Sequence, residues 1–282
     1  MNKIEKKPEV SIIISYYNEK QNNFTKSIRS ILNQTFTNFE LIIVQDGGNE
    51  LELPSDHRII KIINEKNEGL GSSLNKALKI SKGEYIARHD ADDISLPNRI
   101  QVQLDFLKKN PDIDLLGSAA YIISEDNNLL GVWNQAVIHK DLCSHLWREI
   151  PIKHPSWMFK RDWILKKTNL YVTMKRGQDQ YFLITNCLKN NYYQLSSPLI
   201  FYRHKKLPIL FKIIGKFAVI KANFNNRDII KTLLSIFYSS TLLISSFFYS
   251  KKNKYTVDID KYFSRSINKK KNLLKLLNSL VS

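Results

Sequence analysis

The first hundred residues alternate between short apolar runs and longer segments in which apolar residues recur every three or four positions. Continuous β-branched runs are typical of strands buried on both faces, whereas the longer spacing is typical of amphipathic helices. This alternation predicts an α/β fold with a mostly parallel central sheet flanked by helices. Strands are predicted over residues 10–16, 39–45, 58–63 and 84–89, and helices around 24–32, 70–78 and 100–107.

Three carboxylates follow the fourth predicted strand, in the sequence Asp90-Ala91-Asp92-Asp93. In parallel α/β sheets, ligands bind beyond the carboxyl ends of the strands. Carboxylates this close repel one another unless water or a cation neutralises them, and Mg²⁺ and Mn²⁺ take oxygen ligands while bridging to substrate phosphates. A metal site is one interpretation, and a polar turn in which Asp93 caps the next helix is the other. Arg88 and His89, just before the cluster, are placed to meet a phosphate.

A second polar turn, Asp46-Gly47-Gly48, follows the second predicted strand. Glycines at such a point allow a tight turn and the close approach of a ligand. The Asp46 carboxylate could accept the N–H of a nucleobase, although a plain Asp-Gly turn has the same sequence.

Five blocks of sequence stand in order along the chain. They are VSIIISYYNE…SIRSILNQTFTNFELIIVQDGG from residue 10, NEGLGSSLNKALKISKGEYIARHDADDISLPNRI from 67, HPSWMFKRD from 154, GQDQYF from 177 and FYRH from 201. Together they resemble the catalytic domain of family-2 glycosyltransferases, which are inverting nucleotide-sugar enzymes. The resemblance covers about residues 8–204 and implies a GT-A fold, whose central sheet is Rossmann-like.

The resemblance implies a donor site for a nucleotide-sugar, with a UDP-sugar preferred. Asp90 and Asp92 match the family's DxD motif, which holds Mn²⁺ or Mg²⁺ against the donor diphosphate, with Asp92 as the direct ligand. Arg88 is implied to lie close to the sugar or the phosphates. The residues that match donor-binding positions are Ser15, Tyr17, Asp46, Arg88 and Asp90.

The later blocks imply the catalytic base. Asp179 matches the aspartate of the family's Glu-Asp pair, which removes the acceptor proton, and Gln178 stands where the pair has glutamate. His204, with Tyr202 and Arg203, falls near a Tyr-Arg-x-His block that borders the diphosphate, and His204 is a further candidate metal ligand. It stands one place earlier than the block requires.

His154, Gln178 and Trp157 are candidates to line the acceptor pocket. The alternative is a structural role, since histidines are often held by hydrogen bonds and tryptophans usually pack. The resemblance implies an acceptor hydroxyl on a glycan, or on a glycan linked to polyprenyl diphosphate, in the synthesis of bacterial surface polysaccharide.

The chain has 282 residues, 43% of them hydrophobic, and a net charge of +17, a composition that fits a globular protein. Residues 200–282 carry 17 Lys and Arg against three acids, and so hold +14 of that charge. We therefore divide the chain into a catalytic domain, 1–205, and a basic helical extension, 206–282.

Apolar stripes beside lysines, at 210–220 and 273–281, predict amphipathic helices that lie on an anionic membrane surface. The alternative is a helical cap on the catalytic domain with a solvated basic face.

Residues 233–249 are apolar but include five serines and one threonine, and these 17 residues fall short of a membrane span. We expect a buried or interfacial hairpin there.

The start, MNKIEKKPEV, lacks the apolar core of a signal peptide, which predicts a cytoplasmic protein at the inner face of the membrane rather than a secreted one. Cys143 and Cys187 are too few for a disulfide scaffold or a cysteine zinc cluster.

Two other functions compete with glycosyl transfer. A non-enzymatic basic protein on a degenerate nucleotide-binding fold could bind membrane or nucleic acid, but the basic extension has no recognisable nucleic-acid module. A nucleotidyltransferase would normally carry a Gly-rich phosphate loop near the N-terminus, where this chain has SYYNE. The sequence therefore favours glycosyl transfer, with nucleic acid an unlikely partner.

Overall fold

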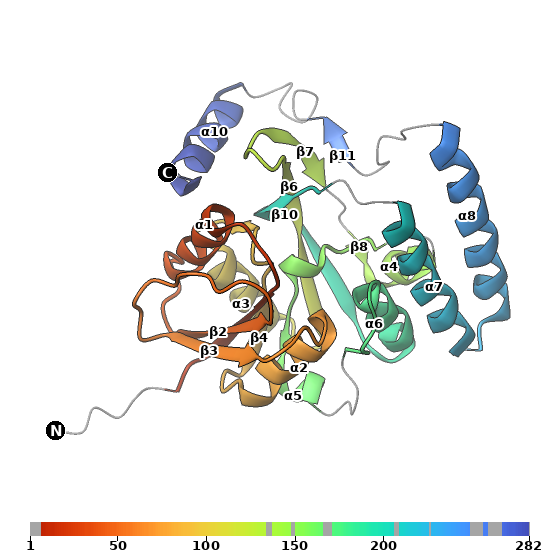
Figure 1. Cartoon of the computed structure of the whole chain (residues 1–282), viewed down its shortest axis with the longest axis horizontal. Coiled ribbons are helices and arrows are strands. Elements are labelled where there is room, and N and C mark those ends of the chain that lie inside the picture. Colours follow the sequence, from red (N-terminus) through yellow and green to blue (C-terminus); the bar gives the residue numbers. More distant parts are fainter. Residues whose placement is uncertain are drawn as a thin grey trace.

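A computed structural model describes residues 7–133, 137–147, 150–165, 171–205, 209–225, 227–248, 256–258 and 267–281. Figure 1 shows a central sheet with helices packed around it. The first half of the chain follows the predicted alternation, and each predicted element begins and ends within three residues of its predicted limits. The elements are β1 (Val10–Tyr16), α1 (Gln21–Leu32), β2 (Phe39–Asp46), β3 (Ile59–Asn64), α2 (Leu70–Ile80), β4 (Tyr85–Arg88), β5 (Ile94–Ser95) and α3 (Arg99–Lys109).

The second half of the chain has shorter strands and a group of helices at its end. Its strands are β6 (Leu115–Ile123), β7 (Leu129–Trp133), β8 (Val137–Ile138), β9 (Met158–Lys160), β10 (Tyr192–Arg203) and β11 (Thr256–Asp258). Its α-helices are α4 (His139–His145), α5 (Arg161–Leu165), α6 (Gln178–Asn186), α7 (Ile209–Asn225), α8 (Ile229–Phe248) and α10 (Ile267–Val281). Two 3₁₀ turns, η1 (His154–Ser156) and η2 (Cys187–Lys189), complete the described elements.

The sheet runs in the order β11-β7-β6-β9-β4-β1-β2-β3, and β10 joins it beside β5, β6 and β8. The α/β fold is therefore confirmed, but the sheet is mixed rather than mostly parallel. Parallel pairing is confined to β3-β2-β1-β4 and to β6 with β10. Strand β9 lies antiparallel between β4 and β6, and β7 follows β6 through a tight turn, which allows only antiparallel pairing.

The core has one apolar layer on each face of the parallel strands. Because successive strand residues point to opposite faces, Ile13 packs in a cluster with α2 and α6, whereas Ile12 and Ile14 pack in a cluster with α1 and α3. All three isoleucines are fully buried. This explains why the strands are apolar at every position rather than at alternate ones.

Both ends of the basic extension pack on the rest of the chain. Helix α7 buries Val219 and Ala222 in the same cluster as α6, and β11 adds a strand beside β7. Helix α10 lies beside α1 at the other side of the molecule (Figure 1). It buries Leu273 and Leu277 against Phe201 and other apolar side chains of the sheet. The apolar stripe of α10 is thus used for packing on the body.

The pair α7–α8 stands at the edge of the molecule, away from α10 (Figure 1). The two helices pack on each other and cover residues 209–225 and 229–248. The prediction of a hairpin within 233–249 is wrong, because residues 233–248 belong to one continuous helix, α8, on which Leu233 and Phe237 are exposed. Residue 249 lies outside the described residues. Among the described helices, none is long and apolar enough to cross a membrane.

Candidate active site

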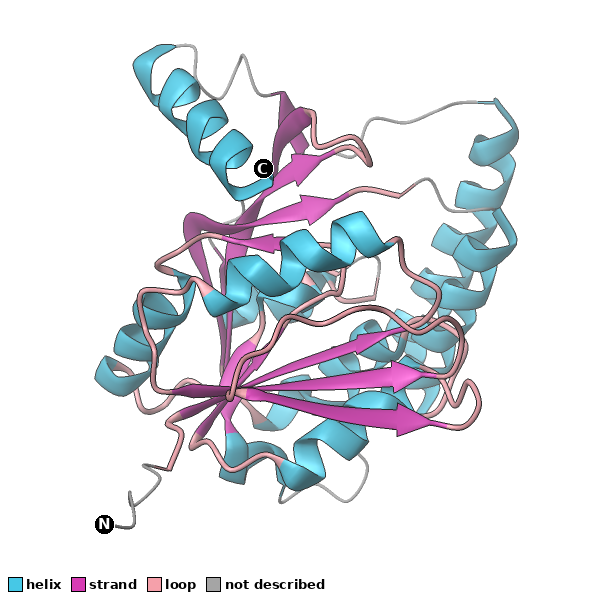
Figure 2. Cartoon of the chain, turned by 60° about the vertical axis from the view of Figure 1, so that its left-hand side comes forward, coloured by secondary structure: helices cyan, strands magenta, loops and turns pink. Residues whose placement is uncertain are grey.

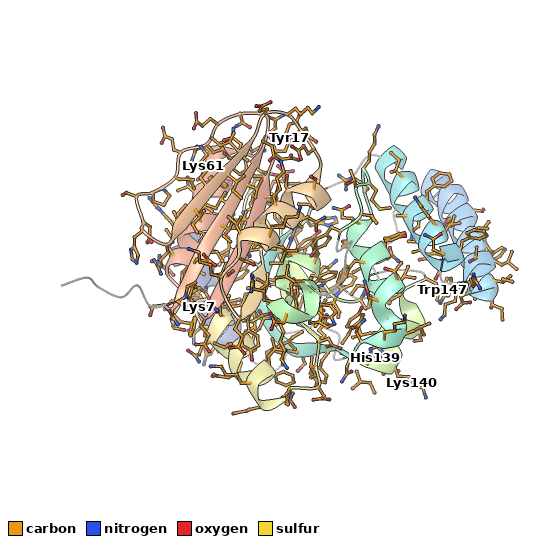
Figure 3. The ribbon with its side chains drawn as sticks, turned by 90° about the horizontal axis from the view of Figure 1, so that it is seen from below. Lys7, Tyr17, Lys61, His139, Lys140 and Trp147 are labelled. Carbon is orange, nitrogen blue, oxygen red and sulfur yellow. The ribbon has the colours of Figure 1, made fainter. Side chains whose placement is uncertain are left out.

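The last residues of β1, β2 and β4, together with the loops that follow β1, β4 and β10, carry most of the predicted site residues. Figure 2 shows the parallel strands pointing the same way, with the loops that follow them gathered at one end. Figure 3 shows the two ends of this sheet: Lys7 lies just before β1, and Tyr17 lies just after it at the opposite end. The sheet therefore brings together residues as far apart in sequence as Glu19 and Lys205, which are separated by 186 positions.

The loop after β4 is held in place by buried contacts of Arg203, at the end of β10. The Arg203 backbone N–H donates to Asp93 Oδ1 at 2.7 Å, and its Nε donates to the Asp92 carbonyl at 2.9 Å. The rest of the guanidinium donates to the Ser124 and Glu125 carbonyls and to Asn127 Oδ1. Arg203 thus fixes the Asp90–Asp93 loop instead of pointing toward a ligand.

His89 also supports this loop from within the core. It is fully buried, with Nε2 3.2 Å from the Asp93 carbonyl and Nδ1 3.0 Å from Arg99 Nη1. Burial, and then the positive charges of Arg99 and Arg88, lower the pKa of His89 well below its usual value. The prediction that His89 meets a phosphate is therefore wrong, because both ring nitrogens already have partners.

Arg88 is buried at the centre of the site. Its Nη2 forms an ion pair with Asp90 Oδ1, and its backbone N–H donates to the Trp157 carbonyl at 2.9 Å. The side chain is nearly inaccessible to solvent, yet Nε and Nη1 have no hydrogen-bond partner. Buried polar atoms without partners are costly, so these two N–H groups are ready to donate to an anionic ligand.

Asp92 shares a cation with Glu19, a residue of the loop after β1. Lys205 Nζ lies 2.8 Å from Asp92 Oδ2 and 3.1 Å from Glu19 Oε2. Burial, and then the charge of Asp90, raise the pKa of Asp92. His204, by contrast, has an exposed side chain, and its backbone N–H donates to the Ile123 carbonyl at 2.9 Å. The amine beside Asp92 therefore comes from Lys205, one residue after the predicted histidine.

Asp46 is buried at the end of β2 and anchors the loop before α2. Its carboxylate accepts hydrogen bonds from Asn64 Nδ2 and from the Glu68 and Gly69 backbone N–H groups, at 2.8 to 2.9 Å. A carboxylate has about four acceptor positions, so one remains for a ligand. The predicted contact with a nucleobase would use that position.

Ser15 and Tyr17, at and just after the end of β1, lie beside the turn formed by Asp46, Gly47 and Gly48. The backbone of Gly48 has φ +71°, and a Cβ there would lie 2.5 Å from Asn18 Oδ1 and 2.9 Å from the Tyr17 ring. Glycine is thus required for the close approach of the two loops. Tyr17 is 48% exposed and Ser15 is half-buried, so both can reach a ligand at this end of the sheet.

Asp179 lies in the first turn of α6. Gly177 precedes it with φ +81°, and a Cβ on Gly177 would lie 2.7 Å from Ala218 Cβ in α7. Asp179 Oδ1 accepts the Gln180 backbone N–H at 2.8 Å. Burial raises the pKa of Asp179, while this hydrogen bond and the charge of Arg88 oppose the rise. Asp179 therefore lies within electrostatic range of Arg88 and Asp90, at and just after the end of β4, and its role as catalytic base stays a prediction.

The three predicted acceptor residues differ in what they offer. His154 and Gln178 are buried beside the site, and Gln178 Oε1 has no hydrogen-bond partner. Trp157 has no exposed surface and packs its ring 4.5 Å from the His154 ring, so it supports the wall of the site from behind. His154 Nε2 lies 3.0 Å from the Tyr171 hydroxyl. Among these, His154 and Gln178 have polar atoms near the Asp179 side of the site.

Comparison with known proteins decides the family. The family model of glycosyl transferase family 2 matches residues 11–168, more than half of the chain. The chain belongs to glycosyl transferase family 2. The match runs from β1 to the residues just after α5 and includes Asp46, Arg88, Asp90 and Asp92. Asp179 and Lys205 lie beyond it.

Curated relatives of this family-2 glycosyltransferase come from several organisms. It is 40% identical over 195 residues to an uncharacterized glycosyltransferase of Methanocaldococcus jannaschii, across 66% of this chain and 67% of that protein. It is 35% identical over 128 residues to WfgD of Escherichia coli, named as a UDP-Glc:alpha-D-GlcNAc-diphosphoundecaprenol beta-1,3-glucosyltransferase, across 43% of this chain and 49% of that protein. The chain spans about half the length of several other curated relatives that it matches.

The fold of this glycosyltransferase is similar to that of S. aureus TarS 1-349, whose structure contains UDP. The TM-score is 0.59 at 16% identity, and the alignment covers 96% of this chain and 80% of that one. At this identity the likeness concerns the fold alone. It confirms a GT-A-type α/β arrangement.

Sequence reasoning missed three residues of the site: Glu19, Tyr171 and Lys205. Glu19 stands two residues after Tyr17 in the segment SYYNE, and Lys205 follows His204 directly in the run YRHKK. A lysine after a candidate ligand gives no signal by itself in so basic a region. Tyr171 stands in no recognised block, and only folding brings its hydroxyl to His154.

Proposed function

We propose that this glycosyltransferase is an inverting, divalent-cation-dependent enzyme that moves a sugar from UDP to a hydroxyl of a glycan or lipid-linked glycan. The single observation that carries the proposal is the convergence of Arg88, Asp90 and Asp179: Arg88 pairs with Asp90, and both charges act on the Asp179 carboxyl. The proposed leaving-group site and the proposed base thus lie within electrostatic range of each other, which favours a single displacement.

The carboxylates after β4 suit Mn²⁺ or Mg²⁺. Such ions are commonly held by one or two carboxylates together with substrate phosphates, and Asp92 and Asp90 supply that number. Among the described residues there is no group of three or more His, Cys, Asp or Glu that could hold a metal by itself. The ion would therefore bind together with the donor. When bound, it stabilises the negative charge that develops on the departing diphosphate.

Arg88 is proposed to bind the donor beside the metal. Its unpartnered Nε and Nη1 are buried donors, and hydrogen bonds from a guanidinium to a phosphate or a sugar hydroxyl would satisfy them. The base and ribose would lie over Tyr17 and Ser15 and against the remaining acceptor position of Asp46. A uracil N–H suits that carboxylate. TarS was solved with UDP, and the WfgD name gives a UDP-sugar donor, which supports the choice of nucleotide.

Asp179 is proposed to be the general base. An acceptor hydroxyl is a poor nucleophile, and a positioned carboxylate that removes its proton typically contributes about 10²–10⁴ in rate. The hydrogen bond from Gln180 orients the carboxylate. His154, Tyr171 and Gln178 would orient the acceptor, and burial keeps His154 neutral by lowering its pKa well below its usual value. WfgD is named for an acceptor on diphosphoundecaprenol, which supports a lipid-linked acceptor here.

A nucleotide-sugar panel tests this function. We expect UDP-sugars, with Mn²⁺ or Mg²⁺ present, to raise the melting temperature and to be hydrolysed slowly without an acceptor. GDP- and CMP-sugars serve as controls for the nucleotide. Transfer to a synthetic polyprenyl-diphosphate glycan would then report the anomeric configuration of the product. A protein that responds to no nucleotide would leave the non-enzymatic basic binding protein as the better interpretation.

We also propose that the α7–α8 pair binds an anionic membrane surface, which would place the site near a lipid-linked acceptor. Phe217 and Phe224 stand on one face of α7 with Lys221 between them, and all three are exposed. On α8, Ile230, Leu233 and Phe237 recur on one face and are also exposed. A cavity of about 530 Å³ opens beside them between α6 and α8. Apolar side chains among cations fit a bilayer interface with acidic headgroups.

Vesicle flotation tests the membrane proposal. Replacing Phe217, Leu233 and Phe237 together with serine should release the protein from phosphatidylglycerol vesicles, because these side chains are 65%, 62% and 69% exposed and would insert between headgroups. The matched control is Ile63→Ser, which removes an equally exposed apolar side chain from β3. Equal flotation of the triple variant and the wild type, or equal binding to phosphatidylcholine alone, would contradict the proposal.

A further inference from the structure

Lys205 lies where three carboxylates of the site meet. Its ammonium contacts Asp92 at 2.8 Å and Glu19 at 3.1 Å, and the negative charge of Asp90 acts on both carboxylates. Asp92 is 11% exposed and Glu19 is 22% exposed. Neighbouring carboxylates this well shielded from water need a cation, and in the described structure the ammonium supplies it.

The amine reaches this position from a well-anchored point of the chain. Lys205 stands two residues after Arg203, whose backbone and side chain donate hydrogen bonds to the same loop. The end of β10 is thus tied to Asp92 and Asp93 by hydrogen bonds that do not involve Lys205. The lysine side chain itself is 40% exposed and flexible, so it can leave Asp92 without moving the strand.

A divalent cation at Asp92 and the ammonium at Asp92 would exclude each other. An ammonium 2.8 Å from Asp92 Oδ2 fills the space beside that oxygen, and two positive charges within a few ångströms repel strongly in a shielded site. The displaced amine would then be close to the metal-bound diphosphate, which offers it a new anionic partner. Lysine is well suited to this exchange because its charge sits on a long, mobile stem.

We propose, resting on the proposed function, that Lys205 and a divalent cation are alternative partners of Asp92, and that the displaced amine binds the donor diphosphate. Lys205 thus lowers the affinity of the empty site for metal and raises its affinity for metal-bound nucleotide. Loading of metal and donor becomes coupled, with Lys205 changing partner between the two states.

The test measures binding of Mn²⁺ and of UDP separately, in wild-type protein and in Lys205→Met. Mn²⁺ alone, without nucleotide, is followed by electron paramagnetic resonance of the free ion, and UDP is followed by calorimetry at saturating Mn²⁺. We expect Mn²⁺ to bind about tenfold more tightly to the variant and UDP about tenfold more weakly, since each step gains or loses one charged contact. The matched control is Lys108→Met, which removes a lysine paired with Glu9 at the opposite end of the strands.

Opposite changes in the affinities for Mn²⁺ and for UDP distinguish this role of Lys205 from a structural one. A structural lysine would weaken both ligands together when removed, and that result, or an unchanged affinity for Mn²⁺, would overturn the exchange. Lys205→Arg provides a second comparison, because it keeps the charge and should stay near the wild type in both measurements. Wild-type protein that binds neither Mn²⁺ nor UDP would instead overturn the proposed function.

Discussion

Replacement of Asp179 with asparagine is expected to reduce sugar transfer by about 10²–10⁴-fold while UDP binds as it does to the wild type. The amide has the same shape and can still accept the Gln180 N–H, so α6 should begin at the same residue. It cannot accept a proton from an acceptor hydroxyl. Turnover with the donor identified by the nucleotide panel, together with calorimetry of UDP and Mn²⁺, measures the two effects separately.

The pH dependence of turnover is a second test of Asp179 as the general base. Burial raises the pKa of Asp179, so its base form is lost at a higher pH than for an ordinary aspartate as the solution is acidified. As the pH is lowered, wild-type turnover should therefore decrease with this raised pKa. The residual turnover of Asp179→Asn should not show this decrease. The matched control is Asp162→Asn, which changes an exposed aspartate in the first turn of α5. Undiminished turnover in Asp179→Asn would remove Asp179 from the base role.

The parallel half of the fold could be predicted because its signals are local. Ile12, Ile13 and Ile14 are all buried, on alternating faces, and a short β-branched run of this kind is typical of a strand covered on both sides. The residues at the ends of these strands were then placed by topology alone, since parallel strands end at one edge. Asp46 and the Asp90–Asp93 loop follow directly from this rule.

The antiparallel half could not be predicted in the same way. Strand β9 has only three residues, and its neighbours β4 and β6 are distant in sequence, so its position depends on long-range pairing. The contacts of Lys205 have the same origin, because β10 reaches the site only after pairing with β6 and β5. Periodicity describes which face of an element is apolar but says nothing of what covers it.

The basic extension shows this limit most clearly. The stripes at the start and the end of residues 206–282 have the same apolar and basic pattern in sequence, and both were predicted to face a membrane. In the structure Leu277 is 2% exposed against the sheet, whereas Phe217 is 65% exposed on α7. Tertiary packing separates two patterns that sequence could not distinguish, and it limits the proposed membrane surface to α7–α8.

Replacement of Asp92 with asparagine is expected to reduce turnover at least about 100-fold and to abolish the gain in UDP affinity that Mn²⁺ provides. The neutral amide is a poor ligand for a hard cation. Asp90 is paired with Arg88, and Asp93 is buried and accepts the Arg203 backbone N–H, so neither can replace Asp92 fully. Calorimetry of UDP with Mn²⁺ and with EDTA measures the loss directly.

The contrast between Asp92→Asn and Lys205→Met makes this experiment informative beyond the metal itself. Both variants break the same 2.8 Å contact, but the first removes the carboxylate and the second removes its competing ammonium. Mn²⁺ should therefore bind more weakly to Asp92→Asn and more tightly to Lys205→Met. Asp105→Asn, an exposed aspartate on α3, is the control for the loss of one negative charge. Activity that is unaffected by EDTA in the wild type would rule out the metal role of Asp92, because the carboxylate would then serve only to hold Lys205.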